Sequence, residues 1–243
     1  MKELLTAFLT ALVAGSFAGC AVDLTLYPLD FFKTRIQSRS SKPFKLSQVY
    51  SGLSWTLLAS MPCAGTFWGA YTLAKYTLGS QTLAALAGSL SASLVRNPFE
   101  VLKQQLQAGY QQTPLNILNT QGISGLYVGV GSLVMRELPF DTLQMVVYEF
   151  LKQSMDLGPL KGAVSGSLAA FVTTPIDVAK TRIMTDSGKG VYKNLLQTVS
   201  LVYKDEGLAS LWAGCLVRVL FATFGGMIFF NTYELVFSII SYN

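Results

Sequence analysis

Long apolar segments dominate the chain, and polar stretches separate them at regular intervals. Three apolar segments end in a proline followed two residues later by an acid, at Pro28, Pro98 and Pro175. A polar, turn-rich stretch follows each motif, and a second apolar segment then begins near a glycine. The three glycines are Gly52, Gly129 and Gly214. Because each apolar segment has the roughly 20 residues that a helix needs to cross a bilayer, the pattern predicts an all-α membrane protein with six transmembrane helices.

The same order of features occurs three times, which indicates an internal repeat. The proline motifs read PLDFFKTRIQ at 28–37, PFEVLKQQLQ at 98–107 and PIDVAKTRIM at 175–184. Paired small residues precede each proline in the same register, and such pairs let helix backbones approach closely in lipid. The pairs are Gly15 and Gly19, Ala85 and Ser89, and Gly162 and Gly166. We therefore divide the chain into three pseudo-symmetric two-helix repeats, at 1–80, 81–156 and 157–243, which form one transmembrane domain.

Short amphipathic helices are expected on the membrane surface between the two spans of a repeat, at 115–120 and 195–204. The even number of crossings places both termini on one side. Most Lys and Arg residues outside the spans lie on the opposite side, together with the proline motifs, so that side is predicted to be the positive one. The start of the chain shows no cleavage pattern for a targeting segment, and we expect the first apolar segment to belong to the mature protein.

The composition fits a chain that lies largely in lipid. It is 51% hydrophobic and 13% charged, whereas a soluble domain usually carries about 25% charged residues. A soluble catalytic domain is disfavoured, and so is nucleic-acid binding, because the basic residues behind the net charge of +5 form no continuous patch. Cys20, Cys63 and Cys215 stand among apolar or small neighbours and suit neither a disulfide framework nor a zinc site. No metal or cofactor is expected.

Each proline motif carries an acid and a lysine three residues apart, on one helix face beyond a kink. Charges at that depth are costly in lipid unless they face a cavity or one another. Three copies around a pseudo-threefold axis can pair each acid with the lysine of a neighbouring copy, and the resulting ring can act as a gate. The alternative is that these charges snorkel and merely mark the interface. The six residues are Asp30, Lys33, Glu100, Lys103, Asp177 and Lys180.

A second motif, an aromatic residue followed by an acid, two spacers and a base, recurs toward the ends of the second spans. Two copies are incomplete, because Thr72 replaces the acid in one and Phe237 replaces the base in another. Two rings on either side of a central cavity are what alternating access requires. The motif residues are Tyr71, Lys75, Tyr148, Glu149, Lys152, Tyr233 and Glu234.

The two triplicated motifs together resemble those of the mitochondrial carrier family over essentially the full chain. That resemblance implies a six-helix bundle in the mitochondrial inner membrane that exchanges small solutes through one central site. It also implies termini toward the intermembrane space, so that the positive side is the matrix side. A monomer is expected, in contact with membrane lipid such as cardiolipin.

The resemblance also implies the partners in each gate. The matrix pairs are Asp30 with Lys103, Glu100 with Lys180, and Asp177 with Lys33. Gln37 and Gln107 occupy the family's brace positions beneath the pairs, whereas Met184 cannot brace. On the cytoplasmic side only Glu234 and Lys75 keep both charges; the incomplete pairs are Glu149 with Phe237 and Lys152 with Thr72. We therefore expect the cytoplasmic gate to be weaker and the cavity to rest open to the cytosol.

Within the family, the segments VDL at 22–24, MRELPF at 135–140 and TTPIDVAKTR at 173–182 resemble S-adenosylmethionine carriers. Such carriers would exchange cytosolic S-adenosylmethionine for matrix S-adenosylhomocysteine. The alternative is a carrier for another amino-acid-like or cationic solute. An iron carrier is disfavoured, because the chain has no histidine. A membrane-bound enzyme is also disfavoured, because no nucleophile and base stand together, while a non-transporting scaffold of this fold stays open.

The implied substrate contacts lie near mid-membrane, mostly on the second spans. Arg136 can bind the substrate carboxylate and Glu137 the ammonium group, and Asp23 is a candidate partner of the ammonium or the sulfonium. Arg96 lies at the same depth and is expected to pair with Glu100 at i, i+4. Other wall positions are small: Ala59, Ser60, Ala222 and Thr223.

Two residues depart from the family pattern. Gln105 stands where the second proline motif usually has a base, and Ser89 stands where a glutamate is expected in S-adenosylmethionine carriers. If that glutamate selects the cationic substrate, either Asp23 has a larger role here or the specificity differs.

Overall fold

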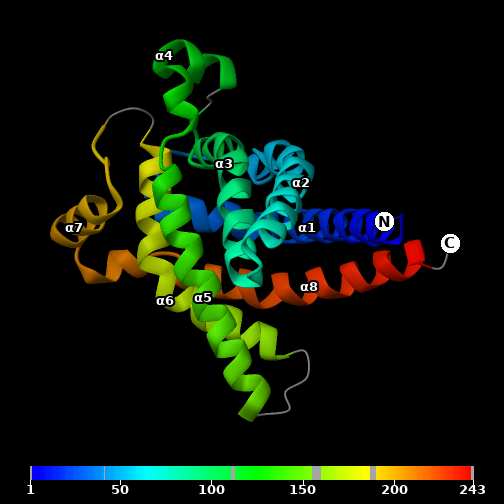
Figure 1. Ribbon diagram of the computed structural model, residues 1–243. Helices are drawn as coiled ribbons and strands as arrows, with labels where there is room; N and C mark the ends of the chain where they lie inside the picture. The colour runs from blue at the N-terminus through cyan, green and yellow to red at the C-terminus, as the bar shows by residue number, and fades with distance from the viewer. Residues whose placement is uncertain (1, 41, 111–112, 155–159, 187–189, 242–243) are drawn as a thin grey trace.

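The computed structural model describes residues 2–40, 42–110, 113–154, 160–186 and 190–241 (Figure 1). Over these ranges the chain is helical and contains no strand, so the all-α prediction is confirmed. The long helices are α1 (Lys2–Gln37), α2 (Leu53–Leu78), α3 (Gln81–Gln107), α5 (Val130–Ser154), α6 (Leu160–Thr185) and α8 (Cys215–Ser241). The short helices are η1 (Leu46–Gln48), α4 (Pro114–Leu126), α7 (Leu195–Glu206) and η2 (Leu208–Trp212).

The long helices pack most extensively as the pairs α1 with α8, α2 with α3, and α5 with α6. Figure 1 shows that these pairs diverge: α1 and α8 extend to the right of the view, and α5 and α6 extend toward the bottom. A proline lies inside α1, α3 and α6, at Pro28, Pro98 and Pro175. Ion pairs join the helical segments that follow these prolines, whereas the opposite ends of the α1–α8 and α5–α6 pairs lie far apart in this view (Figure 1).

One glycine directly precedes the second helix of each of the three predicted repeats, as the sequence predicts. Gly52, Gly129 and Gly214 have φ values of 89°, 77° and 72° and directly precede α2, α5 and α8. This left-handed backbone favours glycine. Each glycine also lies close to the end of another long helix. A Cβ added at Gly52 would lie 3.2 Å from Lys103 Cα of α3, one at Gly129 would lie 3.1 Å from Met184 Cγ of α6, and one at Gly214 would lie 3.4 Å from Gln37 Cγ of α1. The starts of α2, α5 and α8 thus contact α3, α6 and α1 in turn.

The two predicted surface helices form, with different lengths. α7 ends two residues beyond the predicted 195–204, and α4 continues well past the predicted 115–120. Inside α4 the backbone bends at Gly122, with φ 68° and ψ −167°. Gly207, which follows α7, has nearly the same conformation, with φ 82° and ψ 173°. The corresponding glycines thus turn the chain in the same way before α5 and α8.

The small residues before the prolines have unequal surroundings. A Cβ on Gly15 or Gly19 would meet nothing within 4 Å, whereas one on Gly166 would lie 3.9 Å from the Cβ of Ala222. The side chain of Ala85 is outside the described residues. The tightest approach in this part of α3 is instead at Gly88, where a Cβ would lie 2.9 Å from the carbonyl oxygen of Phe67. Close packing of α2 and α3 therefore depends on a glycine next to the predicted pair.

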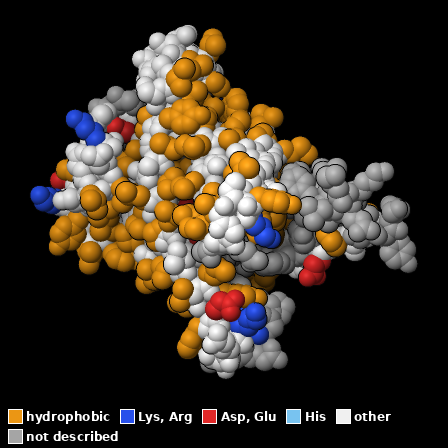
Figure 2. Space-filling view, in the orientation of Figure 1, with side chains coloured by type: hydrophobic (Ala, Val, Ile, Leu, Met, Phe, Trp, Pro, Cys, Tyr) orange, Lys and Arg blue, Asp and Glu red, His pale blue; other side chains and the backbone are white. Residues whose placement is uncertain are grey.

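Two segments of the described chain are long and apolar enough to cross a membrane, Leu160–Thr185 and Leu208–Ile239. In α3 and α5, charged residues such as Arg96 and Glu100, and Arg136 and Glu137, lower the hydropathy of the helix. Many large hydrophobic side chains are nevertheless exposed on the long helices, and hydrophobic atoms cover much of the face shown in Figure 2. An exposed apolar surface of this extent suits lipid better than water.

Candidate substrate site and ion-pair ring

Three ion pairs link α1, α3 and α6 into a ring just beyond the prolines. The pairs are Lys103 Nζ to Asp30 Oδ2 at 2.8 Å, Lys180 Nζ to Glu100 Oε1 at 2.9 Å, and Lys33 Nζ to Asp177 Oδ2 at 2.7 Å. Asp177 is 1% exposed and Lys180 is 3% exposed. Both of these buried charges contact an oppositely charged side chain, which is the condition under which buried ions are tolerated.

Glutamine side chains support the three acids of the ring. Gln37 Nε2 donates to Asp177 Oδ2 at 2.9 Å, and Gln107 Nε2 donates to Asp30 Oδ2 at 3.0 Å. Met184 occupies the third equivalent position and offers no such donor. Glu100 is instead supported from its own helix, because Gln104 Nε2 donates to its Oε1 at 2.7 Å. Sequence reasoning missed Gln104, although its i, i+4 spacing from Glu100 was a visible signal.

A second ring, of side chain to backbone hydrogen bonds, lies below the ion pairs. Arg35 Nη1 donates to the Gln107 carbonyl at 3.2 Å, Gln105 Nε2 to the Met184 carbonyl at 3.3 Å, and Arg182 Nε to the Gln37 carbonyl at 2.5 Å. The three donors occupy equivalent positions in the three proline motifs, and the three acceptors occupy a second set of equivalent positions. Gln105 lacks the usual positive charge but still donates this hydrogen bond, so its departure from the family pattern leaves the ring complete.

Glu206, the last residue of α7, ties this layer to the surface helices. Its carboxylate accepts two hydrogen bonds from Arg182, at 2.7 and 2.8 Å, and pairs with Arg39 Nη1 at 3.1 Å. The hydrogen bonds from Arg182, assisted by the charges of both arginines, lower the pKa of Glu206 to about 2. The carboxylate therefore stays ionised across the physiological pH range.

A cavity of about 270 Å³ lies between α2, α3 and α5. Its charged lining residues are Arg96 on α3 and Arg136, Glu137 and Asp141 on α5, and the rings of Phe67 and Phe140 form part of its wall. The cavity thus combines cations, anions and aromatic surface in one place. That combination suits a zwitterionic ligand that also carries an apolar or aromatic part.

Glu137 is the most heavily engaged group in the cavity. Its Oε1 accepts hydrogen bonds from Arg96 at 3.2 Å and from Arg136 at 3.1 Å, and its Oε2 accepts one from Ser93 at 2.6 Å. The expected pairing of Arg96 with Glu100 is wrong. Glu100 points to Lys180 in the ring, and Arg96 reaches across to the neighbouring helix α5 instead.

The cavity wall also touches the ring. Arg136 Nε lies 3.8 Å from Asp177 Oδ1, and Arg218 Nε lies 3.8 Å from Asp177 Oδ2. Arg218 is further held by Thr173, which accepts a hydrogen bond from its Nη2 at 2.7 Å. Arg136 Nε makes no hydrogen bond within the described residues. Arg218 Nη1 also makes no hydrogen bond among the described residues. Of these two arginines, Arg136 is the one that lines the cavity.

The motif at the opposite ends of the second spans is open in this structure. Lys75, Glu149, Lys152 and Glu234 are exposed, and no ion pair joins them in the part of the chain that is described. Among the described aromatic rings, Lys75 Nζ contacts only that of Tyr71 in its own helix, and it lies 5.8 Å from the ring centroid. Tyr148 is exposed, and the side chain of Tyr233 lies outside the described residues. The predicted pair of Glu234 and Lys75 is absent from this conformation.

The family model for the mitochondrial carrier protein matches residues 6–48, 74–157 and 159–243. These segments cover most of the chain. The chain belongs to the mitochondrial carrier family.

Curated relatives align over nearly the same span. The mitochondrial S-adenosylmethionine carrier protein of Danio rerio is 38% identical, with 93% of this chain and 96% of the relative aligned. The protein of that name in Mus musculus is 38% identical, with 93% of each chain aligned. The probable S-adenosylmethionine carrier 2, chloroplastic, of Arabidopsis thaliana is 35% identical, with 92% of this chain and 72% of the relative aligned. As a mitochondrial carrier, this chain is a membrane transporter of a small molecule and not an enzyme.

The structure gathers only part of the predicted substrate site of this carrier around the cavity. Arg96, Arg136 and Glu137 line it, whereas Asp23 does not. Asp23 lies on α1, half-buried, and forms no ion pair or hydrogen bond among the described residues. The small wall positions also lie elsewhere. They are Ala59, which is buried, Ser60, which bonds within α2, Ala222, and Thr223, whose Oγ1 lies 2.7 Å from Ser167 Oγ of α6.

Sequence reasoning missed two polar residues of the carrier's cavity. Ser93 supports Glu137, and Asp141 lines the cavity one turn beyond Glu137 on α5. The i, i+4 relation of Asp141 to Glu137 was the available signal. Ser93 offered no comparable signal, because its role depends on how α3 packs against α5.

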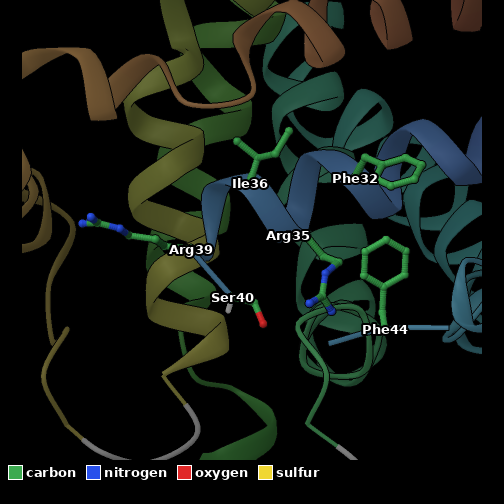
Figure 3. Close-up of a pocket in the computed structure, with 6 residues that line it drawn as sticks. All are labelled: Phe32, Arg35, Ile36, Arg39, Ser40 and Phe44. Carbon is green, nitrogen blue, oxygen red and sulfur yellow. The ribbon is translucent and has the colours of Figure 1, made fainter. Parts of the chain in front are cut away.

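A larger hollow, of about 460 Å³, lies beside the end of α1 (Figure 3). It is lined by Phe32, Arg35, Ile36, Arg39, Ser40 and Phe44. Both arginines already have partners: Arg35 donates to the carbonyls of Gln107 and Lys42, and Arg39 pairs with Glu206. The guanidinium carbon of Arg35 also lies 4.8 Å from the Phe44 ring centroid. The hollow therefore reflects how the carrier anchors the segment after α1, and we do not assign the transported solute to it.

Proposed function

We propose that this carrier exchanges cytosolic S-adenosylmethionine for matrix S-adenosylhomocysteine across the mitochondrial inner membrane. The relatives that align over nearly the whole chain carry the name of S-adenosylmethionine carriers. In the proposed arrangement, six transmembrane helices form three repeats, 1–80, 81–156 and 157–243, with both termini toward the intermembrane space. The proline-motif ends then face the matrix, and the splayed ends face the cytosol.

The observation that carries the proposal is the cavity that joins Arg96, Arg136 and an acid on α5. Arg136 lines the cavity, where its guanidinium suits the carboxylate of an amino-acid-like substrate, and Arg96 lines the same cavity. Glu137 accepts three hydrogen bonds from protein groups, so we assign it to holding both arginines rather than to the ammonium group. Asp23 has no hydrogen-bond or ion-pair partner among the described residues and lies outside this cavity, so we propose that it contacts the ammonium group in another conformation of the carrier.

The two ends of the carrier support alternating access. We propose that the ring of Asp30, Glu100 and Asp177 with the three lysines closes the matrix side in this conformation. Gln37 and Gln107 act as braces that raise the cost of opening it. In the opposite conformation the ring separates, and Glu234 pairs with Lys75 while Tyr71, Tyr148 and Tyr233 line the closing cytoplasmic end.

A carrier for another amino-acid-like or cationic solute is the second candidate. The same cavity favours it, because Arg136 and Arg96 suit any substrate with a carboxylate. At about 270 Å³, the cavity lies just below the usual range for sites that enclose a drug-sized ligand. We therefore place the amino-acid end of the substrate there and let the remainder extend toward the open end.

Uptake of labelled S-adenosylmethionine into liposomes tests the proposal. The purified carrier should take up the label rapidly when the vesicles contain S-adenosylhomocysteine and slowly when they are empty. Arg136→Ala and Asp23→Asn should each lower the rate at least tenfold, whereas Lys204→Ala on α7 should leave it unchanged. Equal activity of the two site variants and wild type would remove the site, and uptake of another amino acid in preference to S-adenosylmethionine would favour the second candidate.

A further inference from the structure

Asp141 is an acid of the cavity without a partner. It lines the cavity from α5, its side chain is exposed, and it forms no hydrogen bond or ion pair among the described residues. Nothing in the surrounding packing requires a carboxylate at this position. A charged group that lines a cavity and is not used by the fold is available to a ligand.

The other acid of the cavity, Glu137, already has partners within the protein. Glu137 is bound by Arg96, Arg136 and Ser93, so its negative charge is offset before any ligand enters. The carboxylate of a zwitterionic substrate would meet the remaining donors of the two arginines. The negative charge that stays uncompensated in this cavity is then that of Asp141.

The position of Asp141 along α5 determines which part of a bound substrate would lie beside its carboxylate. It is five residues after Arg136, which corresponds to about 7.5 Å along a helix axis. α5 begins beside the end of α6 and runs away from the ring, so Asp141 lies on the side of Arg136 that leads to the splayed ends. A substrate held by its carboxylate at Arg136 would place groups a few bonds further along beside Asp141.

S-adenosylmethionine and S-adenosylhomocysteine differ at that place. The first has a methylated, positively charged sulfonium a few bonds from its carboxylate, and the second has a neutral thioether there. We propose that Asp141 is a specificity-determining residue that attracts the sulfonium and so favours S-adenosylmethionine over S-adenosylhomocysteine. The attraction is stronger in a partly desolvated cavity than in bulk water. This inference rests on the proposed function, and it gives Asp141 a role distinct from that of Asp23, whose ammonium partner is present in both molecules.

Substrate preference in reconstituted vesicles tests the role of Asp141. KM should be measured for labelled S-adenosylmethionine and, separately, for labelled S-adenosylhomocysteine, with the same internal counter-substrate. Asp141→Asn should raise the KM for S-adenosylmethionine about tenfold and change that for S-adenosylhomocysteine less than twofold, and Asp141→Glu should restore the preference. Asp205→Asn, an exposed acid on α7, serves as the matched control and should change neither value.

The outcomes separate the two proposals. If Asp141→Asn raises both KM values equally, or changes neither, Asp141 does not distinguish the sulfonium from the thioether. The inference is then overturned, while the carrier function stands. If wild type transports neither molecule, the proposed function fails and the inference falls with it. Because Asp141 is exposed and has no partner within the described chain, the variants should unfold at the wild-type temperature, and a shared loss of folding would contradict this reading of the site.

Discussion

The Nε atom of Arg136 lies 3.8 Å from the Oδ1 atom of Asp177, so a side chain of the cavity wall touches an acid of the ion-pair ring. Asp177 also binds Lys33, which closes the ring between α6 and α1. A substrate carboxylate that draws Arg136 toward itself would withdraw a positive charge from Asp177. The cavity and the ring are thus coupled through one arginine.

We expect Arg136→Lys to weaken this coupling while keeping the positive charge. Lysine presents a point charge and cannot bridge Glu137, Asp177 and a ligand with one planar group. Exchange should fall at least tenfold, and binding, followed as the rise in unfolding temperature on adding substrate, should fall less. Equal losses of binding and exchange would show that Arg136 binds substrate without influencing the ring.

The ion-pair ring predicts a penalty for removing one partner. Asp30→Asn leaves Lys103 without its partner at 2.8 Å, and loss of one member of a buried pair typically costs about 3–5 kcal/mol. The unfolding temperature in detergent should therefore drop clearly. The charge-swapped carrier with Asp30→Lys and Lys103→Asp should recover part of that loss, and a double variant no more stable than Asp30→Asn would argue against the pair as a stabilising contact.

The backbone hydrogen-bond ring predicts that Gln105 matters for its donor and not for its charge. Gln105→Leu removes the donor to the Met184 carbonyl and should lower the free energy of unfolding by about 1–3 kcal/mol, because a buried polar group loses its partner. Gln105→Arg can keep the donor and should retain most of the stability. The free energies of both variants can be compared with wild type by denaturant unfolding in detergent. If Gln105→Leu matched wild type, the hydrogen bond would contribute nothing.

The network around Glu206 predicts a pH-dependent contribution to stability. Its pKa is lowered from 4.5 to about 2 in the folded chain. A lowered folded-state pKa stabilises the fold above the unfolded value, and the contribution is lost as the pH falls through the folded value. The difference in unfolding temperature between wild type and Glu206→Gln should be constant above about pH 5 and shrink between pH 4.5 and 2. A difference that grew on acidification would contradict the assignment.

The repeat made much of the fold and of the ring predictable from the sequence. Pro28, Pro98 and Pro175 give the register of three helices, and threefold closure then leaves few choices of partner for each acid. Arg96 shows the limit, because i, i+4 spacing favours Glu100, whereas the packing of α3 against α5 offers Glu137. Gly88 and Ser93 were unpredictable for the same reason: their roles depend on which residues of the neighbouring helix face them.

The side from which the cavity can be reached tests the proposed gating most directly. In a carrier whose three cysteines are replaced by serine, Ser89→Cys places a thiol on the cavity wall and Lys204→Cys places a control thiol on α7. A membrane-impermeant maleimide should label Ser89→Cys from the cytosolic side and Lys204→Cys from the matrix side in vesicles of known orientation. Predominant labelling of Ser89→Cys from the matrix side would contradict a carrier held closed there by its ring of ion pairs.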